Sequence, residues 1–208
     1  MKQLPTIYKK IQYALNDLPG EVAHKEMFPT RRVASEELKT AENYRISAVL
    51  ALFYEEKSKT KLILTQRNDY KGSHGGQISF PGGKMEDWDD NTIATALRET
   101  HEEIGIPPSD IDVLGKLTDV YIPVSKFLVH PYIGFHQNVP EFVLSTREVK
   151  EVIPFDLELL LDESTLQKRP IKLSNGMILK DIPCFIIDDR IVWGATALML
   201  NEIKIMLK

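Results

Sequence analysis

The most informative stretch of this chain runs Arg98-Glu99-Thr100-His101-Glu102-Glu103-Ile104-Gly105-Ile106. At about 100° per residue, the carboxylates of Glu99, Glu102 and Glu103 fall on one face of a helix. Three aliphatic residues fall near the opposite face, and these are Ile93, Leu97 and Ile104. The spacing therefore predicts an amphipathic helix from about Asn91 to Ile104, with one side packed into a core and three carboxylates presented on the other.

Both ends of this helix carry recognisable signals. Gly105 follows the last helical residue, where a left-handed conformation favours glycine, and Pro107-Pro108 prevents the helix from continuing. At the other end, Asp90 is placed to cap the first turn. These signals predict a helix of defined length.

The three glutamates crowd one helical turn, and such like charges repel by about 0.2–0.5 kcal/mol per pair. Clustered carboxylate oxygens are the ligands that hard cations such as Mg²⁺ or Mn²⁺ prefer, and these ions bridge substrate phosphates. The alternative is an ordinary solvated face, which is what most Glu-rich helix faces are. The loop Pro81-Gly82-Gly83-Lys84 just upstream favours the metal site, because backbone N–H groups of a glycine loop can approach a phosphate.

The segments around this helix are rich in strand-forming residues. Tyr44–Tyr54 and Lys61–Arg67 are β-rich runs around the polar stretch EEKSKT, which predicts a hairpin. Further short strands are predicted in four segments, 112–120, 127–135, 171–180 and 183–193. Asn175-Gly176 is expected to form a two-residue hairpin turn between two strands. Strands interleaved with a few helices predict a mixed α/β domain.

Helical patterns also mark the two ends of the chain. In residues 6–18, four apolar side chains recur at helical spacing, namely Ile7, Ile11, Leu15 and Leu18, and Pro19-Gly20 then ends the helix. Residues 21–43 are polar and predicted to be irregular. The tail from Ala195 to Lys208 is predicted to be a closing helix. We therefore expect residues 1–43 to form an N-terminal helix and an irregular extension packed on the core, and residues 44–208 to form the main domain.

The composition narrows the class of protein. The chain has 208 residues, 43% of them hydrophobic, so it can bury a substantial core. Its net charge of −4 supplies no global field for nucleic acid or a membrane, and neither partner is expected. The single cysteine, Cys184, lies in the apolar run CFII, which favours a buried structural thiol over a nucleophile. The first residues lack an apolar signal segment and the chain ends in MLK, so a cytoplasmic protein is expected.

The carboxylate helix and the loop before it resemble the Nudix box, GX5EX7REUXEEXGU, where U is a bulky aliphatic residue. Six residues match its second half: Arg98, Glu99, Glu102, Glu103, Gly105 and Ile106. Thr100 stands where an aliphatic residue is usual. Counting back from Arg98, Asp90 occupies the glutamate position and Lys84 the glycine position, as one extra loop residue would produce. The resemblance implies the Nudix fold, an α/β/α sandwich with a mixed central β-sheet, and metal-dependent cleavage of a diphosphate bond.

A second resemblance points to the coenzyme A pyrophosphatase branch, which reads approximately LLTxRSxxxRxxxGxxxFPGG before the box. Eight residues match this pattern: Leu64, Thr65, Arg67, Gly76, Phe80, Pro81, Gly82 and Gly83. Asn68 replaces the usual serine and Gly72 the usual arginine, and Lys71 is a candidate for the missing charge. Residues 148–154 and the WGATA-type segment 191–197 are also similar to this branch, so the resemblance covers residues 44–207.

The resemblance assigns roles to particular side chains. Glu99, Glu102 and Glu103 would hold Mg²⁺ (or Mn²⁺). Arg98 is expected to orient a glutamate through a bidentate bond. The general base would be Glu103, Glu99 or Glu148. Substrate contacts are expected from five residues: Arg67, Lys71, Gly82, Gly83 and Lys84.

For a coenzyme A pyrophosphatase the products would be 3′-phosphoadenosine 5′-phosphate and 4′-phosphopantetheine. Two alternatives stay open. The small-molecule substrate could be another nucleoside diphosphate derivative, such as a dinucleotide or a nucleotide sugar. A Nudix fold that binds a nucleotide as a sensor belongs to another class, but a sensor has no need of the crowded glutamates. A homodimer is compatible with the sequence.

Overall fold

The computed structural model describes residues 4–28, 43–68, 76–173 and 175–208, and it is built around an eight-stranded sheet. The strands of this sheet are β1 (Arg45–Glu56), β2 (Lys59–Arg67), β3 (Ile78–Ser79), β4 (Gly82–Lys84), β5 (Ile111–Lys116), β6 (Val120–Ile122), β7 (Phe127–His136) and β8 (Val149–Asp156). The main path is β3-β2-β1-β7-β5, and β4, β6 and β8 attach to β1, β7 and β2. β1 runs parallel to β7, whereas β1 and β2 are antiparallel. The sheet is therefore mixed.

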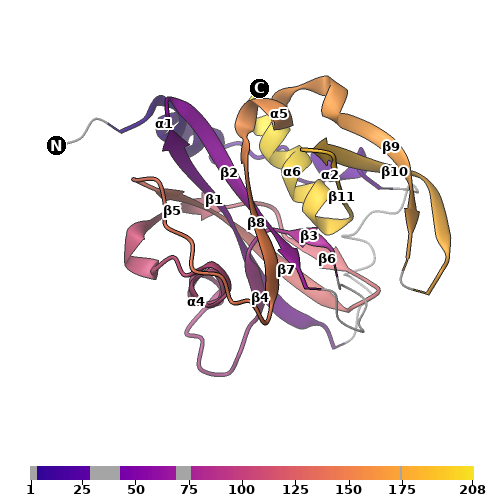
Figure 1. Ribbon diagram of the computed structural model, residues 1–208, viewed down its shortest axis with the longest axis horizontal. Coiled ribbons are helices and arrows are strands. Elements are labelled where there is room, and N and C mark those ends of the chain that lie inside the picture. Colours follow the sequence, from indigo (N-terminus) through magenta and orange to yellow (C-terminus); the bar gives the residue numbers. More distant parts are fainter. Residues whose placement is uncertain (1–3, 29–42, 69–75, 174) are drawn as a thin grey trace.

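Helices cover both faces of this sheet (Figure 1). α4 (Thr92–Ile104) lies on one face. On the other lie α1 (Thr6–Ala14), α2 (Glu21–Lys25), α5 (Leu157–Leu161) and α6 (Ala195–Met206). Leu50 and Leu52 of β1 pack with Ala96 and Ile104 of α4, while Phe53 packs in the core on the α6 side. Because β1 is buried on both faces, its sequence is a nearly continuous apolar run. The predicted α/β/α sandwich with a mixed sheet is confirmed.

The strands β1 and β2 form the predicted hairpin. Phe53 pairs with Leu62 and Glu56 with Lys59, and the turn residues Lys57 and Ser58 both have positive φ, as a two-residue hairpin turn requires. β8 has no counterpart among the predicted strands. It contains Pro154, and a proline inside an apolar run normally argues against a strand. β8 tolerates this proline because it pairs with β2 at the edge of the sheet.

A second, three-stranded sheet has the order β11-β10-β9. Its strands are β9 (Leu166–Lys172), β10 (Ile178–Ile187) and β11 (Arg190–Trp193). Asn175-Gly176 lies in the connection between β9 and β10, so the segment 171–180 is not one strand. The connection is longer than the predicted two-residue turn, because the Leu173 N–H donates to the Met177 carbonyl oxygen across it. The segment 183–193 is also divided, because Asp188 and Asp189 turn the chain with φ of 45° and 63°. Aspartate tolerates this left-handed region better than most residues.

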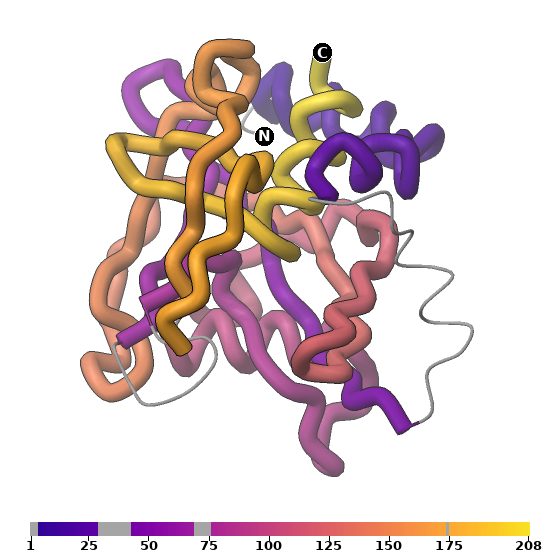
Figure 2. The backbone as a smooth tube through the Cα atoms, turned by 90° about the vertical axis from the view of Figure 1, so that its right-hand side faces the viewer, coloured from indigo at the N-terminus to yellow at the C-terminus, as the bar shows by residue number. Residues whose placement is uncertain are grey.

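The two ends of the chain pack together (Figure 2), and both terminal helices were predicted. The first helix ends at Ala14, earlier than the predicted end at residue 18. Ile11 of α1 is fully buried, and Ile7, Leu15 and Leu18 pack against the same core. The segment 21–43 was predicted to be irregular, which is wrong for residues 21–25, since these form α2 against α6. Residues 29–42 lie outside the described residues. The closing helix α6 is buried over most of its length. None of the helices described is long and apolar enough to cross a membrane.

Candidate active site

The helix α4 has the predicted length, but its cap differs by one residue. The Asn91 Oδ1 accepts a hydrogen bond from the Ala94 N–H at 3.0 Å, so Asn91 is the cap and the prediction for Asp90 was wrong. Asparagine and aspartate cap helices about equally well, and the sequence therefore did not separate the two. Gly105 ends the helix as predicted, with φ of 78° and its N–H bonded to the His101 carbonyl oxygen.

The core-facing side of α4 is narrower than predicted. Ala96 and Ile104 are fully buried and Leu97 packs beside them. Ile93 is 38% exposed, so its predicted place in the core was wrong. Thr100 is buried where the Nudix box usually has an aliphatic residue, and its hydroxyl donates to the Ala96 carbonyl oxygen at 2.7 Å. That bond satisfies the polar group that the substitution brings into the core.

Glu103 is the most buried of the three glutamates, with a side chain 1% exposed, whereas Glu99 is 14% and Glu102 55% exposed. The Gly82 N–H donates to Glu103 Oε2 at 3.1 Å, and Arg67 Nη1 lies 3.3 Å from Oε1. Burial raises the pKa of Glu103 to about 7, against the opposing effects of Arg67 and the Gly82 N–H. The α4 helix therefore turns one carboxylate inward, onto β4.

Glu99 lies directly against β4, called the glycine strand below because it begins with Gly82 and Gly83. A Cβ atom on Gly83 would come within 2.4 Å of the Glu99 carboxyl group, so only glycine permits this approach. Burial raises the pKa of Glu99, although the hydrogen bond from Arg98 opposes the shift. The nearby charges of Glu102 and Glu148 raise it further. Gly82 and Gly83 therefore bring α4 and β4 close enough for two carboxylates to face the strand.

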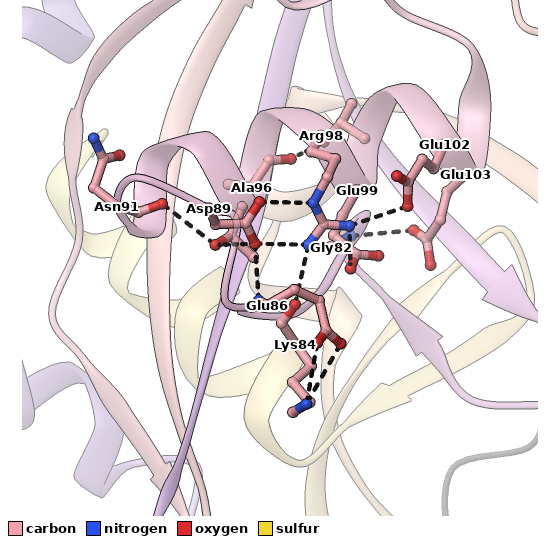
Figure 3. A network of polar contacts seen from close by, with 12 residues as sticks. Gly82, Lys84, Glu86, Asp89, Asn91, Ala96, Arg98, Glu99, Glu102 and Glu103 are labelled. Atoms are coloured by element: carbon pink, nitrogen blue, oxygen red, sulfur yellow. Dashed lines mark hydrogen bonds and ion pairs between the residues drawn. The ribbon is translucent and has the colours of Figure 1, made fainter.

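Arg98 is the centre of a polar network (Figure 3). Its Nε and Nη2 donate to the two carboxylate oxygens of Asp89, each at 2.8 Å. Its Nη1 donates to Glu99 at 2.9 Å and to Glu102 at 3.0 Å, and Nη2 also reaches the Lys84 carbonyl oxygen at 3.1 Å. The bidentate partner was expected to be a glutamate, which was wrong. Aspartate fills that place because the loop folds Asp89, and not a box glutamate, against the flat edge of the guanidinium.

Asp89 was missed as a site residue. Its Oδ2 also accepts from the Thr95 hydroxyl and from the Glu86 N–H, both at 3.0 Å. The hydrogen bond from Arg98 holds the pKa of Asp89 well below its ordinary value. The spacing of the Nudix box points to Asp90 as the partner of Arg98. The extra loop residue places that partner one position earlier, at Asp89. The pair Asp89-Asp90 was the available signal, but the sequence does not say which of the two faces the arginine.

The remaining charged candidates lie at the edge of this network. The Lys84 side chain is half exposed, and its Nζ lies 3.4 Å from Glu86. Glu102 is 55% exposed. Glu148 is exposed in the turn before β8, where its carbonyl oxygen accepts from the Asn68 N–H at 2.9 Å next to the end of β2. The negative charge of Glu148 raises the pKa of both Glu99 and Glu103, so Glu148 lies close enough to interact with these two carboxylates.

Lys71 and Gly72 lie outside the described residues. Cys184 is fully buried, as predicted, and burial raises the pKa of its thiol. Within the described part of the chain, no three His, Cys, Asp or Glu side chains form a ready-made metal site. The three glutamates are instead engaged by Arg98 and Arg67.

Comparison with known proteins agrees with this architecture. A family model described as "NUDIX domain" matches residues 44–172, which span β1 to β9 and include β4 and α4. Proteins from Escherichia fergusonii and Shigella boydii serotype 4, both named "Uncharacterized Nudix hydrolase NudL", are 32% identical to this chain over 165 residues. That alignment covers 79% of this chain and 84% of each relative.

Among solved structures, a MutT/nudix family protein from Enterococcus faecalis has a TM-score of 0.52 at 17% identity. The superposition covers 89% of this chain and 73% of that one, and at this identity it is evidence for the fold alone. The family model and the NudL relatives carry the assignment further, because the model spans more than half of the chain and the relatives are 32% identical over 79% of it. The chain belongs to the Nudix hydrolase family.

Proposed function

We propose that this Nudix hydrolase cleaves the diphosphate of coenzyme A or its derivatives, releasing 3′-phosphoadenosine 5′-phosphate and 4′-phosphopantetheine. The observation that carries the hydrolytic part is the approach of Glu99 and Glu103 to the glycine strand at Gly82-Gly83. The coenzyme A part is supported by the sequence signature that ends in this strand. Arg67 belongs to that signature, and its guanidinium lies at Glu103.

The chemistry of the donor set fits the divalent cation that Nudix enzymes typically use. Glu99, Glu102 and Glu103 offer only hard oxygen ligands. Burial is the largest cause that raises the pKa of Glu99 and of Glu103, and neighbouring carboxylates raise both further. We propose that these three residues hold Mg²⁺ or Mn²⁺. When bound, such a cation neutralises diphosphate oxygens and makes a bound water more acidic.

The protein's own residues would position and neutralise the reacting groups. Arg98, anchored on Asp89, orients Glu99 and Glu102. The half-exposed Lys84 is our candidate for contact with a phosphate oxygen, because its ammonium group is a mobile point charge beside β4. The general base is proposed from three carboxylates of the site, Glu103, Glu99 and Glu148.

A substrate screen with Mg²⁺ tests the proposal, with coenzyme A, 3′-dephospho-coenzyme A, NADH and ADP-ribose as substrates and identification of the products. We expect coenzyme A to have a clearly higher kcat/KM than dephospho-coenzyme A, because Lys71 would contact the 3′-phosphate. Losing such a contact weakens binding by about 1.5–3 kcal/mol, or roughly ten- to hundredfold. Lys71→Ala should therefore erase most of the preference.

Lys172→Ala is the matched control, because it removes an exposed lysine of β9. It should keep the parent ratio of kcat/KM values. A ratio near one in the parent protein would remove the argument for 3′-phosphate recognition. Brisk cleavage of NADH or ADP-ribose without cleavage of either coenzyme A compound would replace coenzyme A by another nucleoside diphosphate derivative. Binding without cleavage of any compound would favour a sensor.

A further inference from the structure

The guanidinium of Arg67 faces the most deeply buried carboxylate of the site. Arg67 is the last residue of β2, and its Nη1 lies 3.3 Å from Glu103 Oε1. The Arg67 side chain is 26% exposed, whereas that of Glu103 is 1% exposed. A buried carboxylate needs a compensating charge nearby. In the protein without metal, Arg67 provides positive charge at this oxygen.

The contact of Arg67 differs from that of the other arginine in the site. Arg98 is anchored on Asp89 by two bonds of 2.8 Å, and it reaches Glu99 and Glu102 from that fixed position. The Arg67–Glu103 distance is longer, at 3.3 Å, while the two arginine side chains are about equally exposed, 26% for Arg67 and 20% for Arg98. Arg98 is thus held by Asp89, which is not one of the proposed metal ligands, whereas Arg67 contacts the proposed ligand Glu103, where a divalent cation would compete with it.

We infer that Arg67 is a positioning residue that takes the place of the metal ion at Glu103: it partly compensates the charge of this carboxylate in the metal-free protein and moves away from it when a divalent cation binds. The inference rests on the proposed function, since Glu103 has to be a metal ligand. A guanidinium and a divalent cation repel each other at one carboxylate. Arg67 therefore stabilises the metal-free protein and at the same time weakens its affinity for the metal.

Calorimetric titration of Mn²⁺ into the metal-free, full-length protein tests this without substrate. Arg67→Gln should bind Mn²⁺ about tenfold more tightly than the parent, which is the low end of the effect of one charge-assisted contact. Arg67→Lys keeps the positive charge and should stay closer to the parent than Arg67→Gln. Unfolding measured in EDTA should show a lower Tm for Arg67→Gln, and Mn²⁺ should raise that Tm by more than it raises the parent's.

Arg190→Gln is the matched control. It also removes an arginine that pairs with a glutamate, since Arg190 Nη2 lies 2.7 Å from Glu151 Oε1 on β8, the strand next to β2. Its Mn²⁺ affinity should equal that of the parent within about twofold, because the pair is outside the proposed metal site. A general effect of lost positive charge would tighten Mn²⁺ binding in both variants and would contradict the inference.

Further outcomes separate this inference from the proposed function. If Arg67→Gln binds Mn²⁺ no more tightly than the parent, the inference is overturned. A raised KM for substrate with unchanged Mn²⁺ affinity would overturn it too, because Arg67 would then act as a substrate contact. Glu103→Gln should weaken Mn²⁺ binding. If Glu103→Gln leaves Mn²⁺ binding unchanged, the proposed metal site is wrong. If Glu103→Gln weakens Mn²⁺ binding but Arg67→Gln does not tighten it, only the proposed role of Arg67 is wrong.

Discussion

Among single residues, Glu103 combines deep burial with a strongly raised pKa. Its carboxylate is buried, and the Gly82 N–H and Arg67 compensate its charge only in part, since the pKa is raised from its ordinary value of 4.5 to about 7. A carboxyl group with a raised pKa in the folded state binds its proton more tightly when folded. Its contribution to stability is full below pH 4.5 and is lost as the pH rises to about 7.

The variant Glu103→Gln should therefore stabilise the metal-free protein at pH 8 and change it little at pH 4.5. Glu103 accepts from the Gly82 N–H at Oε2 and from Arg67 at Oε1, whereas glutamine has a single acceptor oxygen, so it keeps one of these contacts and carries no charge. We expect a gain of about 1–3 kcal/mol in the free energy of unfolding at pH 8, measured by urea unfolding in EDTA. Turnover with Mg²⁺ should fall by orders of magnitude.

Glu102→Gln provides the control for this pH dependence, because the Glu102 side chain is 55% exposed. Its free energy of unfolding should follow that of the parent at both pH values, within about 0.5 kcal/mol. If Glu103→Gln is less stable than the parent at pH 8, the charge of Glu103 stabilises the fold and our account of its burial is wrong.

Asp89 provides the second prediction at this scale. Asp89→Asn loses the charge that holds Arg98 by two bonds, so Glu99 and Glu102 should lose their fixed orientation. We expect a loss of about 1–3 kcal/mol in the free energy of unfolding and a reduction of kcat by about tenfold or more. Urea unfolding and steady-state kinetics measure the two effects.

The neighbouring variant Asp90→Asn is a stringent control, because the box spacing points to Asp90 whereas the structure points to Asp89. Asp90 is exposed, and its variant should have the stability and kcat of the parent. A larger effect at Asp90 than at Asp89 would reverse the structural assignment.

At the scale of elements, the close approach of α4 to β4 depends on two glycines that act differently. A Cβ on Gly82 would lie 2.3 Å from the Ala48 carbonyl oxygen, and its φ of 148° is itself unfavourable for other residues. A Cβ on Gly83 would instead meet the side chain of Glu99 at 2.4 Å. The first contact is with backbone and the second with a movable carboxylate.

We therefore expect the two alanine variants to separate stability from activity. Gly82→Ala should lower the free energy of unfolding by about 2 kcal/mol or more, because the backbone of β1 has to shift. Gly83→Ala should change stability much less but reduce kcat by about tenfold or more, since Glu99 is displaced by about an ångström. Thermal unfolding and kinetics of both variants check this. Equal loss of stability would show that Glu99 cannot move aside.

At the scale of the whole molecule, buried polar contacts join the two ends of the chain. His24 of α2 lies 3.0 Å from Glu202 of α6, with side chains 3% and 0% exposed. Glu202 also accepts a hydrogen bond from the Thr118 hydroxyl at 2.6 Å, so it links the N-terminal segment, the closing helix and the turn after β5. We propose on this basis that residues 1–43 are an extension of the domain formed by residues 44–208.

Removing the histidine from this contact should leave a buried carboxylate with less compensation. His24→Ala should lower the free energy of unfolding by about 3 kcal/mol, whereas Tyr13→Ala, which truncates an 83% exposed side chain of α1, should change it by less than about 0.5 kcal/mol. Urea unfolding measures both. Equal, small effects would mean that the N-terminal helices contribute little to the stability of the whole chain.

The sequence by itself determined the elements whose signals are local. Helical spacing and Gly105 defined α4, and the β-rich runs around a polar turn defined the β1–β2 hairpin. It also determined the family, because Arg98, Glu99, Glu102, Glu103 and Gly105 stand at the spacings of the Nudix box along one helix. Periodicity and turn chemistry act over a few residues, and they can be read without knowledge of distant contacts.

Only the tertiary structure decided which polar groups meet. It placed Asp89, and not Asp90, on Arg98, and it buried Glu103 against Gly82 and Arg67, which are 21 and 36 residues away along the chain. Helical spacing put the three glutamates on one face, but it could not show that β4 covers part of that face. Burial and charge compensation depend on segments that are distant in sequence, so these properties exist only once the chain has folded.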